Sequence, residues 1–130
     1  MDGRRENQTR AGLAATLANP LRLALVERLL DGPRVVGELV EAVGAGQAVV
    51  SKQLGLLREA GLLRCDPEGR LRHYSLADTP AVRRLLAALA DTAHRAAAQA
   101  ARCRKEQVAA GRGTGRVART GRRTPPKGGT

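Results

Sequence analysis

The chain has almost no aromatic residues: among its 130 residues there is no Phe, no Trp and one Tyr, Tyr74. Proteins that hold single-stranded nucleic acid stack its bases on aromatic rings, so that class of binding is poorly supported. The sequence also lacks any run of 18 apolar residues, and no charged start leads into an apolar segment with a cleavage site. We therefore expect a cytoplasmic protein that neither spans a membrane nor is exported.

Cysteine and histidine are equally scarce, with two of each. Cys65 and Cys103 lie far apart in a chain expected inside the cell, which does not favour a structural disulfide. No nucleophile has an evident base and orienting group, and no acidic pair is clustered, so an enzyme is disfavoured. Without aromatics, the core must be built from Leu, Val and Ala, and the length suffices for one modest domain.

Acidic residues are outnumbered by basic ones, 12 against 23, which gives a net charge of +11 and a pI of about 11.4. Such a charge attracts polyanions. Residues 111–130 hold Gly, Thr and Pro with five Arg and one Lys, and no acid. This composition cannot bury enough surface to fold, so we expect a disordered basic tail over residues 109–130.

Residues 36–43 have the spacing of a short amphipathic helix. The apolar residues recur at i, i+3, i+4 and i+7, which places them on one buried face. Gly44 follows, and glycine ends a helix by adopting a left-handed conformation without steric cost. A second helix is therefore expected after this turn, from about Gln47 to Ala60. The apolar positions of the first helix are Val36, Leu39, Val40 and Val43.

The second of these helices combines an apolar face with a polar one. Its inward residues are expected to be Val50, Leu54 and Leu57. The polar side chains suit the edges of DNA bases, since Gln pairs with adenine, Ser and Lys reach bases or phosphates, and the Ala methyl contacts thymine. Most polar helix faces are simply solvated, and only the neighbouring hairpin favours base reading here. The candidate DNA-binding residues on this helix are Gln47, Ala48, Ser51, Lys52 and Gln53.

A hairpin with a cationic tip is predicted next, with its tip at Asp66 to Arg70. Pro67 fixes φ for the second position of a tight turn, and Gly69 suits the end of that turn. Arginines crowd this small ribbon, and packed like charges are costly unless an anion meets them. We therefore interpret Arg70, supported by Arg72, as a contact to a DNA groove or phosphate. The alternative is a solubilising hairpin whose charges only block sheet extension.

Three ordered segments resemble the signature segments of ArsR/SmtB-type winged helix-turn-helix regulators. They are residues 17–26 (LANPLRLALV), residues 50–63 (VSKQLGLLREAGLL) and residues 68–76 (EGRLRHYSL). The resemblance covers about residues 10 to 106. It implies a homodimeric transcriptional regulator, usually a repressor relieved by a ligand, in which the helix from Gln47 is the recognition helix. It also implies that the first and last helices form the dimer interface.

The expected fold is therefore mainly α with a small β-hairpin wing, in the order of four helices, two strands and a fifth helix. Residues 1–8 are expected to be a flexible N-terminus, and residues 9–108 the winged helix-turn-helix DNA-binding and dimerisation domain, with its first helix from about Thr9 to Leu17. The basic tail follows at residues 109–130. That tail is either a solvated segment or an arm that strengthens DNA association without sequence preference.

A long last helix is expected from about Pro80 to Val108, capped by Asp78 or Thr79. Its apolar residues fall within one stripe of roughly 100°. The stripe can pack inside its own domain, but a helix of roughly 42 Å is longer than so small a domain can cover. An antiparallel second copy is the economical partner, and the two recognition helices would then read a near-palindromic site. The predicted stripe is Val82, Leu85, Leu86, Leu89, Ala93, Ala96 and Ala100.

The same helix holds the candidate metal ligands. Members of the resembled family with a metal site there use Asp-x-His from one subunit and His-x-x-His or His-x-x-Glu from the other. The nearest elements here are Asp91 with His94 and Cys103 with Glu106, whose side chains can bind zinc, nickel or cobalt. The first pair has one residue too many, and Cys103 lies in the apolar stripe, where a lone Cys is more often a small buried hydrophobe. Residues 34–39 contain no Cys, so the family's thiolate site before the recognition helix has no counterpart.

The sequence thus predicts a sequence-specific dimeric regulator of transcription that responds to a metal or redox signal. Cys65 is the redox candidate, because the adjacent Arg64 favours a thiolate. Two alternatives stay open. In one, this chain is only the DNA-binding half and a separate partner protein is the sensor. In the other, it is a less specific nucleoid-type protein whose +11 charge dominates binding.

Overall fold

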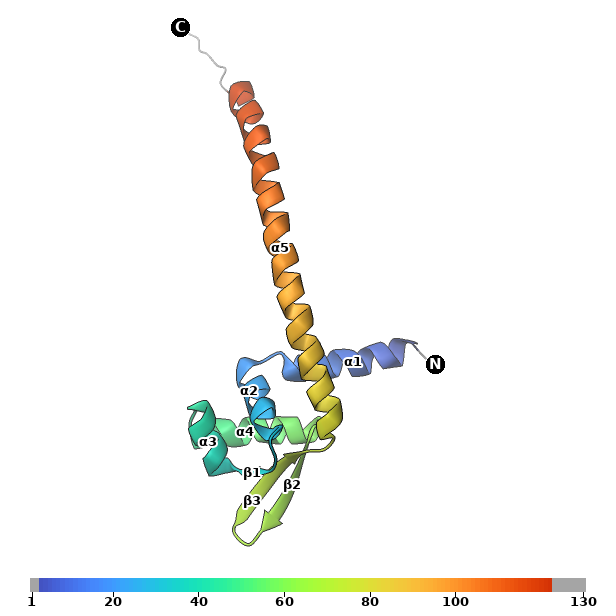
Figure 1. Cartoon of the computed structure of the whole chain (residues 1–130), viewed down its shortest axis with the longest axis vertical. Helices are drawn as coiled ribbons and strands as arrows, with labels where there is room; N and C mark the ends of the chain where they lie inside the picture. Colours follow the sequence, from blue (N-terminus) through green and yellow to red (C-terminus); the bar gives the residue numbers. More distant parts are fainter. Residues whose placement is uncertain (1–2, 123–130) are drawn as a thin grey trace. The chain divides into compact units, whose positions relative to one another are not determined.

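The structure is a computed structural model that describes residues 3–122. The chain divides after Leu86 into two compact units. Figure 1 shows the elements in chain order: α1 (Gly3–Leu17), α2 (Pro20–Leu29), β1 (Arg34–Val35), α3 (Val36–Val43), α4 (Gln47–Glu59), β2 (Leu63–Glu68), β3 (Leu71–Leu76) and α5 (Thr79–Arg122).

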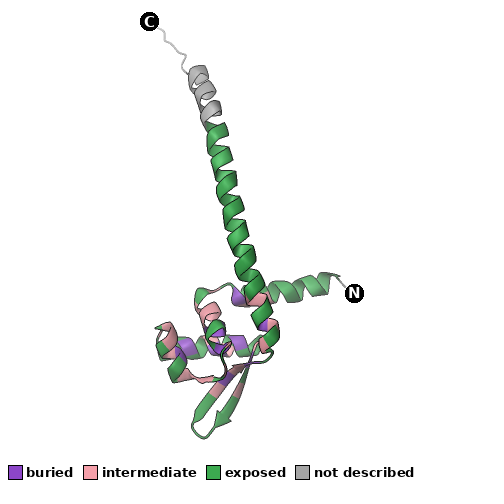
Figure 2. Cartoon of the chain, in the orientation of Figure 1, coloured by how far each residue is buried: buried purple, intermediate pink, exposed green. Residues whose placement is uncertain are grey.

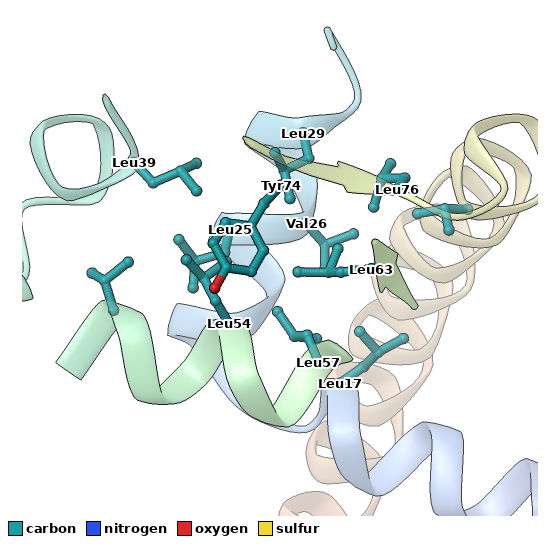
Figure 3. Packing of buried hydrophobic residues seen from close by; sticks show 12 residues of the cluster. Leu17, Leu25, Val26, Leu29, Leu39, Leu54, Leu57, Leu63, Tyr74 and Leu76 are labelled. Carbon is teal, nitrogen blue, oxygen red and sulfur yellow. The ribbon is translucent and has the colours of Figure 1, made fainter. Parts of the chain in front are cut away.

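Leucine and valine build the core of the first unit, as the absence of Phe and Trp predicted. Tyr74, the sole aromatic residue, belongs to the same buried cluster as Leu63 and Leu76 of the sheet and Leu25 of α2 (Figure 3). Each fully buried aliphatic side chain stabilises the fold by about 1.5 to 3 kcal/mol relative to an exposed one. The side chains with 1% exposure or less are Leu25, Val26, Leu29, Leu39, Val50, Leu54 and Leu57.

Local signals set the ends of the two central helices. The side-chain oxygen of Asn19 accepts hydrogen bonds from the N–H groups of Leu21 (2.9 Å) and Arg22 (3.1 Å), which caps α2 at its start. Gly44 has a φ of +70° and ends α3 in the left-handed conformation, as predicted. The chain then turns directly into α4, which begins at Gln47 as expected.

The sheet has one strand more than the sequence predicted. The order is β1-β3-β2, all antiparallel, and β1 pairs through Arg34 with Tyr74 and through Val35 with His73. A strand of two residues is too short to show the alternation by which strands are recognised in a sequence. The predicted hairpin is therefore part of a three-stranded sheet that ties the start of α3 to the wing.

The wing turn also differs from the prediction. Glu68 pairs with Leu71, so the loop is only Gly69-Arg70, and Gly69 has a φ of +64°. Such a two-residue loop needs a left-handed residue, which glycine supplies. Pro67 lies in β2 and not in the turn. Because β2 is an edge strand, the N–H that proline lacks costs no ladder hydrogen bond.

Helix α1 begins at Gly3, earlier than the predicted start at Thr9. Residues 3–8, which the sequence placed in a flexible N-terminus, are helical, while residues 1–2 lie outside the described part of the chain. A hydrogen-bonded ion pair joins Arg10 to Glu6 at 2.9 Å, one turn apart. Such a pair adds about 0.3 to 0.5 kcal/mol to a helix. Only the second half of α1 reaches the core, where Leu17 is buried and Leu13 packs against the cluster.

Helix α5 begins in the first unit, where Val82 is buried and both Leu85 and Leu86 pack on the core. From residue 87 to residue 111 every side chain is exposed (Figure 2). The core therefore covers only the first residues of the predicted stripe, and Leu89, the next one, is 42% exposed. None of the helices in residues 3–122 has the length and apolar composition of a membrane span.

The end of α5 lies beyond the predicted one. The helix continues to Arg122 instead of ending at Val108, so the predicted disordered tail overlaps it. The Gly, Thr, Pro and Arg content of residues 111–130 had predicted an earlier end. Extending an existing helix adds one hydrogen bond per residue and avoids the cost of nucleation. Residues 123–130 of the predicted tail lie outside the described residues.

Candidate nucleic-acid interface

Helix α4 is fixed on one face and open on the other. Its inward residues Val50, Leu54 and Leu57 are completely buried, as predicted. This leaves little freedom for the helix to rotate or slide. The outward face presents small and polar side chains of the kinds that contact base edges and phosphates. The exposed candidates are Gln47, Ala48, Ser51 and Lys52.

Gln53 differs from the other candidates on α4. It is half-buried, and its Oε1 accepts a hydrogen bond of 2.7 Å from Nη1 of Arg22. The Nε of the same arginine donates to the carbonyl oxygen of Thr16. Arg22 thereby joins the end of α1, the start of α2 and the middle of α4. Gln53 is therefore tied to α1 and α2 through Arg22, unlike the other candidates on α4.

The sequence did not reveal this link, because its two side chains are 31 residues apart. The sequence offered one hint of it: Arg22 lies inside the signature segment at residues 17–26, where a charged residue has no role in the core.

The hairpin of β2 and β3 places its cations at and beside the loop. Arg70 stands in the loop, and Arg72 lies on β3 opposite Pro67. Both are exposed. On the same face as Arg72, burial raises the pKa of the Tyr74 phenol above its ordinary 10.0, the neighbouring Cys65 raises it further, and Arg72 opposes the shift. Tyr74 is thus an uncharged core residue at the base of the wing.

The opposite face of the hairpin carries an acid and a histidine. The Nε2 atom of His73 lies 3.0 Å from Oε1 of Glu68, whose side chain is 80% exposed. That nitrogen is buried and makes no hydrogen bond within the described residues, so the contact is an ion pair only when His73 carries a second proton. Glu68 immediately precedes the loop that holds Arg70.

Charge is divided unevenly along the chain. Residues 1–86 hold thirteen basic and ten acidic residues, whereas residues 87–130 hold ten basic and two acidic ones. The unit with α4 and the hairpin is therefore almost balanced. The exposed cations of this candidate interface are Lys52, Arg70 and Arg72, and their effect on a polyanion would come from their position more than from net charge.

The candidate metal ligands all lie exposed on α5. Asp91 is engaged with Arg95, with its Oδ2 at 3.3 Å from Nε. His94 is one turn from Asp91, but Cys103 is nine residues further along, about 14 Å of helix rise. The described residues contain no group of three His, Cys, Asp or Glu placed to hold a metal ion. The four ligands of one chain therefore do not fit a tetrahedral site.

Both cysteines are free thiols. Cys65 is half-buried in β2 opposite Tyr74, and Cys103 is exposed on α5, not buried as an apolar position suggested.

A short helix, a tight turn and a helix with an open polar face, followed by a cationic hairpin, define a winged helix-turn-helix domain. Residues 19–64 match the family model described as bacterial regulatory protein, arsR family. The HTH-type transcriptional regulator NmtR of Mycobacterium tuberculosis is 44% identical over 77 residues, which cover 57% of this chain and 64% of NmtR.

Solved structures give the same result. The crystal structure of the transcriptional repressor BigR from Xylella fastidiosa matches with a TM-score of 0.58 at 38% identity, covering 65% of this chain and 86% of BigR. A homodimeric winged helix-turn-helix DNA-binding domain from Mycobacterium bovis matches with a TM-score of 0.61 at 27% identity, covering 68% and 83%. The chain belongs to the ArsR family, which confirms the resemblance seen in the sequence. It spans slightly less than two thirds of the length of NmtR.

Proposed function

We propose that this protein is a transcriptional repressor that binds duplex DNA as a homodimer and reads its sequence with α4. The carrying observation is the outward face of α4, where Gln47, Ala48 and Ser51 are exposed on a helix whose other face is completely buried. Short side chains on a rigidly packed helix can meet base edges in the major groove with defined geometry. Repression is supported by the relative BigR, which is named a transcriptional repressor.

In this proposal, the wing contacts the backbone or the minor groove next to the bases read by α4. Arg70 suits this role because a two-residue loop holds it at the end of the hairpin. A guanidinium there can pair with a phosphate or enter a narrow minor groove. Arg72 stands beside it on β3 and adds a second cation.

The second copy covers the exposed part of the α5 stripe. Leu89 is 42% exposed, and Ala93, Ala96 and Ala100 follow it at helical spacing. Small side chains let two helices approach closely. The homodimeric relative from M. bovis supports this assembly. A two-fold dimer places two α4 helices on successive major grooves, so the operator is expected to be a near-palindrome.

DNA binding in this proposal does not require a metal ion, because Asp91 is paired with Arg95 and the spacing of Asp91 and His94 is one residue longer than the family's Asp-x-His. The regulatory signal acts on a cysteine thiol of this chain or on a separate sensor protein. In the second case this chain is the DNA-binding half of a two-protein system. The nucleoid-type alternative rests on the basic residues after residue 86. We propose that this segment only strengthens binding without sequence preference.

Direct readout is tested with a duplex selected by the full chain from random sequences. Gln47→Ala and Ser51→Ala should each lower affinity for the selected duplex by about 1 to 3 kcal/mol and leave random duplex nearly unchanged. Gln8→Ala makes the same truncation as Gln47→Ala on an exposed position of α1 and should alter neither affinity. Equal losses on both duplexes for Gln47→Ala would refute base reading by α4.

A further inference from the structure

His73 and Glu68 form a contact that the readout described above does not use. The two residues are diagonal neighbours across the β2–β3 pair, since Glu68 pairs with Leu71 and His73 with Asp66. The Nε2–Oε1 distance is 3.0 Å. Because opposite residues of an antiparallel pair share a face, His73, Asp66 and Glu68 lie on one side of the wing.

Both acidic and basic residues share this face of β2 with the imidazole. From β2 it faces Asp66 directly, with Glu68 on one diagonal and Arg64 on the other. From β1 it is paired with the uncharged Val35, whose N–H donates to Glu38 of α3 at 3.0 Å. The buried Nε2 has no hydrogen-bond partner within the described residues. Glu68 is in contact with this nitrogen at 3.0 Å, so a proton there would meet its carboxylate.

The position of Glu68 connects this contact to DNA. Glu68 is the last residue before the Gly69-Arg70 loop, and its side chain is 80% exposed. A free carboxylate at that position repels phosphate and can neutralise the adjacent Arg70. A positively charged His73 draws the same carboxylate back onto the strand and cancels its charge.

We propose that His73 is a positioning residue of the wing, and that its protonation holds Glu68 away from the DNA backbone so that DNA binding takes up a proton. This inference rests on the proposed function, because it assumes that the wing meets phosphate. Histidine changes charge between about pH 5 and pH 8, so the effect falls in the physiological range. The bound state holds the proton more tightly, and affinity therefore rises as the pH falls, by at most tenfold per pH unit for one proton.

The test measures the affinity of the full chain for the selected duplex and for random duplex at fixed ionic strength, from about pH 8 down to about pH 6. The chain has two histidines, and His94→Gln is the matched control for His73→Gln because His94 lies outside the wing. The wild type and His94→Gln should gain about three- to tenfold in affinity over this range. His73→Gln should gain less than about twofold, and circular dichroism should show unchanged helix content.

Glu68→Gln separates positioning from a direct histidine contact to phosphate. It removes the carboxylate at an exposed position, so it should bind DNA more tightly than the wild type at pH 8 and should lose most of the pH dependence. The inference is overturned if His73→Gln retains the wild-type profile. It is equally overturned if Glu68→Gln keeps the full pH dependence. A wild type that fails to prefer the selected duplex would refute the proposed readout instead, and the pH comparison would still be measured on random DNA.

Discussion

The hydrogen bond between Arg22 and Gln53 gives the sharpest test of how α4 is held. Its length is 2.7 Å, both side chains are half-buried, and the donor is charged. Bonds of this kind contribute about 1.5 to 3 kcal/mol. Gln53→Ala leaves Arg22 with its second acceptor, the carbonyl of Thr16, so we expect a loss near the lower end, about 1.5 kcal/mol in the free energy of unfolding.

For a domain of this size, each kcal/mol lowers Tm by about 4 to 8 °C, so the variant should melt about 6 to 12 °C below the wild type. Chemical denaturation of Gln53→Ala, Arg22→Ala and the double variant should give a coupling energy of about 1 kcal/mol or more. Gln8→Ala, on the exposed face of α1, should stay within about 0.5 kcal/mol of the wild type. An additive double variant, together with a loss confined to the selected duplex, would show that Gln53 reads bases and does not position α4.

Three further outcomes are expected. Leu89→Glu places an unpaired charge in the α5 seam and should give a monomer in sedimentation at low micromolar concentration, whereas Ala98→Glu on the opposite face should stay dimeric; a dimeric Leu89→Glu would exclude this interface. Gly69→Ala should lower the free energy of unfolding in denaturant by about 1 to 2 kcal/mol, because Gly69 has a φ of +64°. Gly55→Ala inside α4, where an added Cβ meets nothing within 4 Å, should raise it by about 0.5 to 1 kcal/mol. Equal effects of the two changes would contradict the loop assignment. Calorimetry of the reduced, metal-free protein should show no nanomolar zinc or nickel binding; binding that disappears in His94→Ala and shifts DNA affinity about tenfold would make the protein a metal sensor.

The helix-turn-helix was predictable because every step in it is a local signal. The spacing of Val36 to Val43 defines a buried face, Gly44 ends the helix, and the next apolar residues repeat with the helical period. The structure confirms these features, with Leu39 and Leu54 completely buried and Gly44 in the left-handed conformation. Exposure of Gln47 follows from burial of the opposite face, so the location of the candidate reading surface was also predictable.

The features that the sequence did not reveal depend on partners distant in the chain or on register. β1 is recognisable only through its pairing with β3. The bond from Arg22 to Gln53 spans 31 residues. The wing loop was misplaced because Pro67 and Gly69 both favour turns, and only the pairing of Glu68 with Leu71 decides between them. The contact of His73 with Glu68 follows from that same register. A turn centred on Pro67 would pair different residues, so the contact could not be predicted.

The stripe on α5 illustrates a limit of periodicity that has a functional consequence. Helical spacing groups Val82, Leu86, Leu89 and Ala93 on one face without saying what covers it. The structure divides this face, since Val82 is 6% exposed and Leu89 is 42% exposed. The first part is covered by the chain's own core, and the apolar pattern nevertheless continues for several turns. Apolar residues that continue along α5 beyond the part covered by the core need another apolar surface to cover them. In the proposed dimer, an identical α5 from a second copy provides a surface with the same spacing. This is why Leu89→Glu, and no change at Val82, is the variant that separates the dimer from the fold.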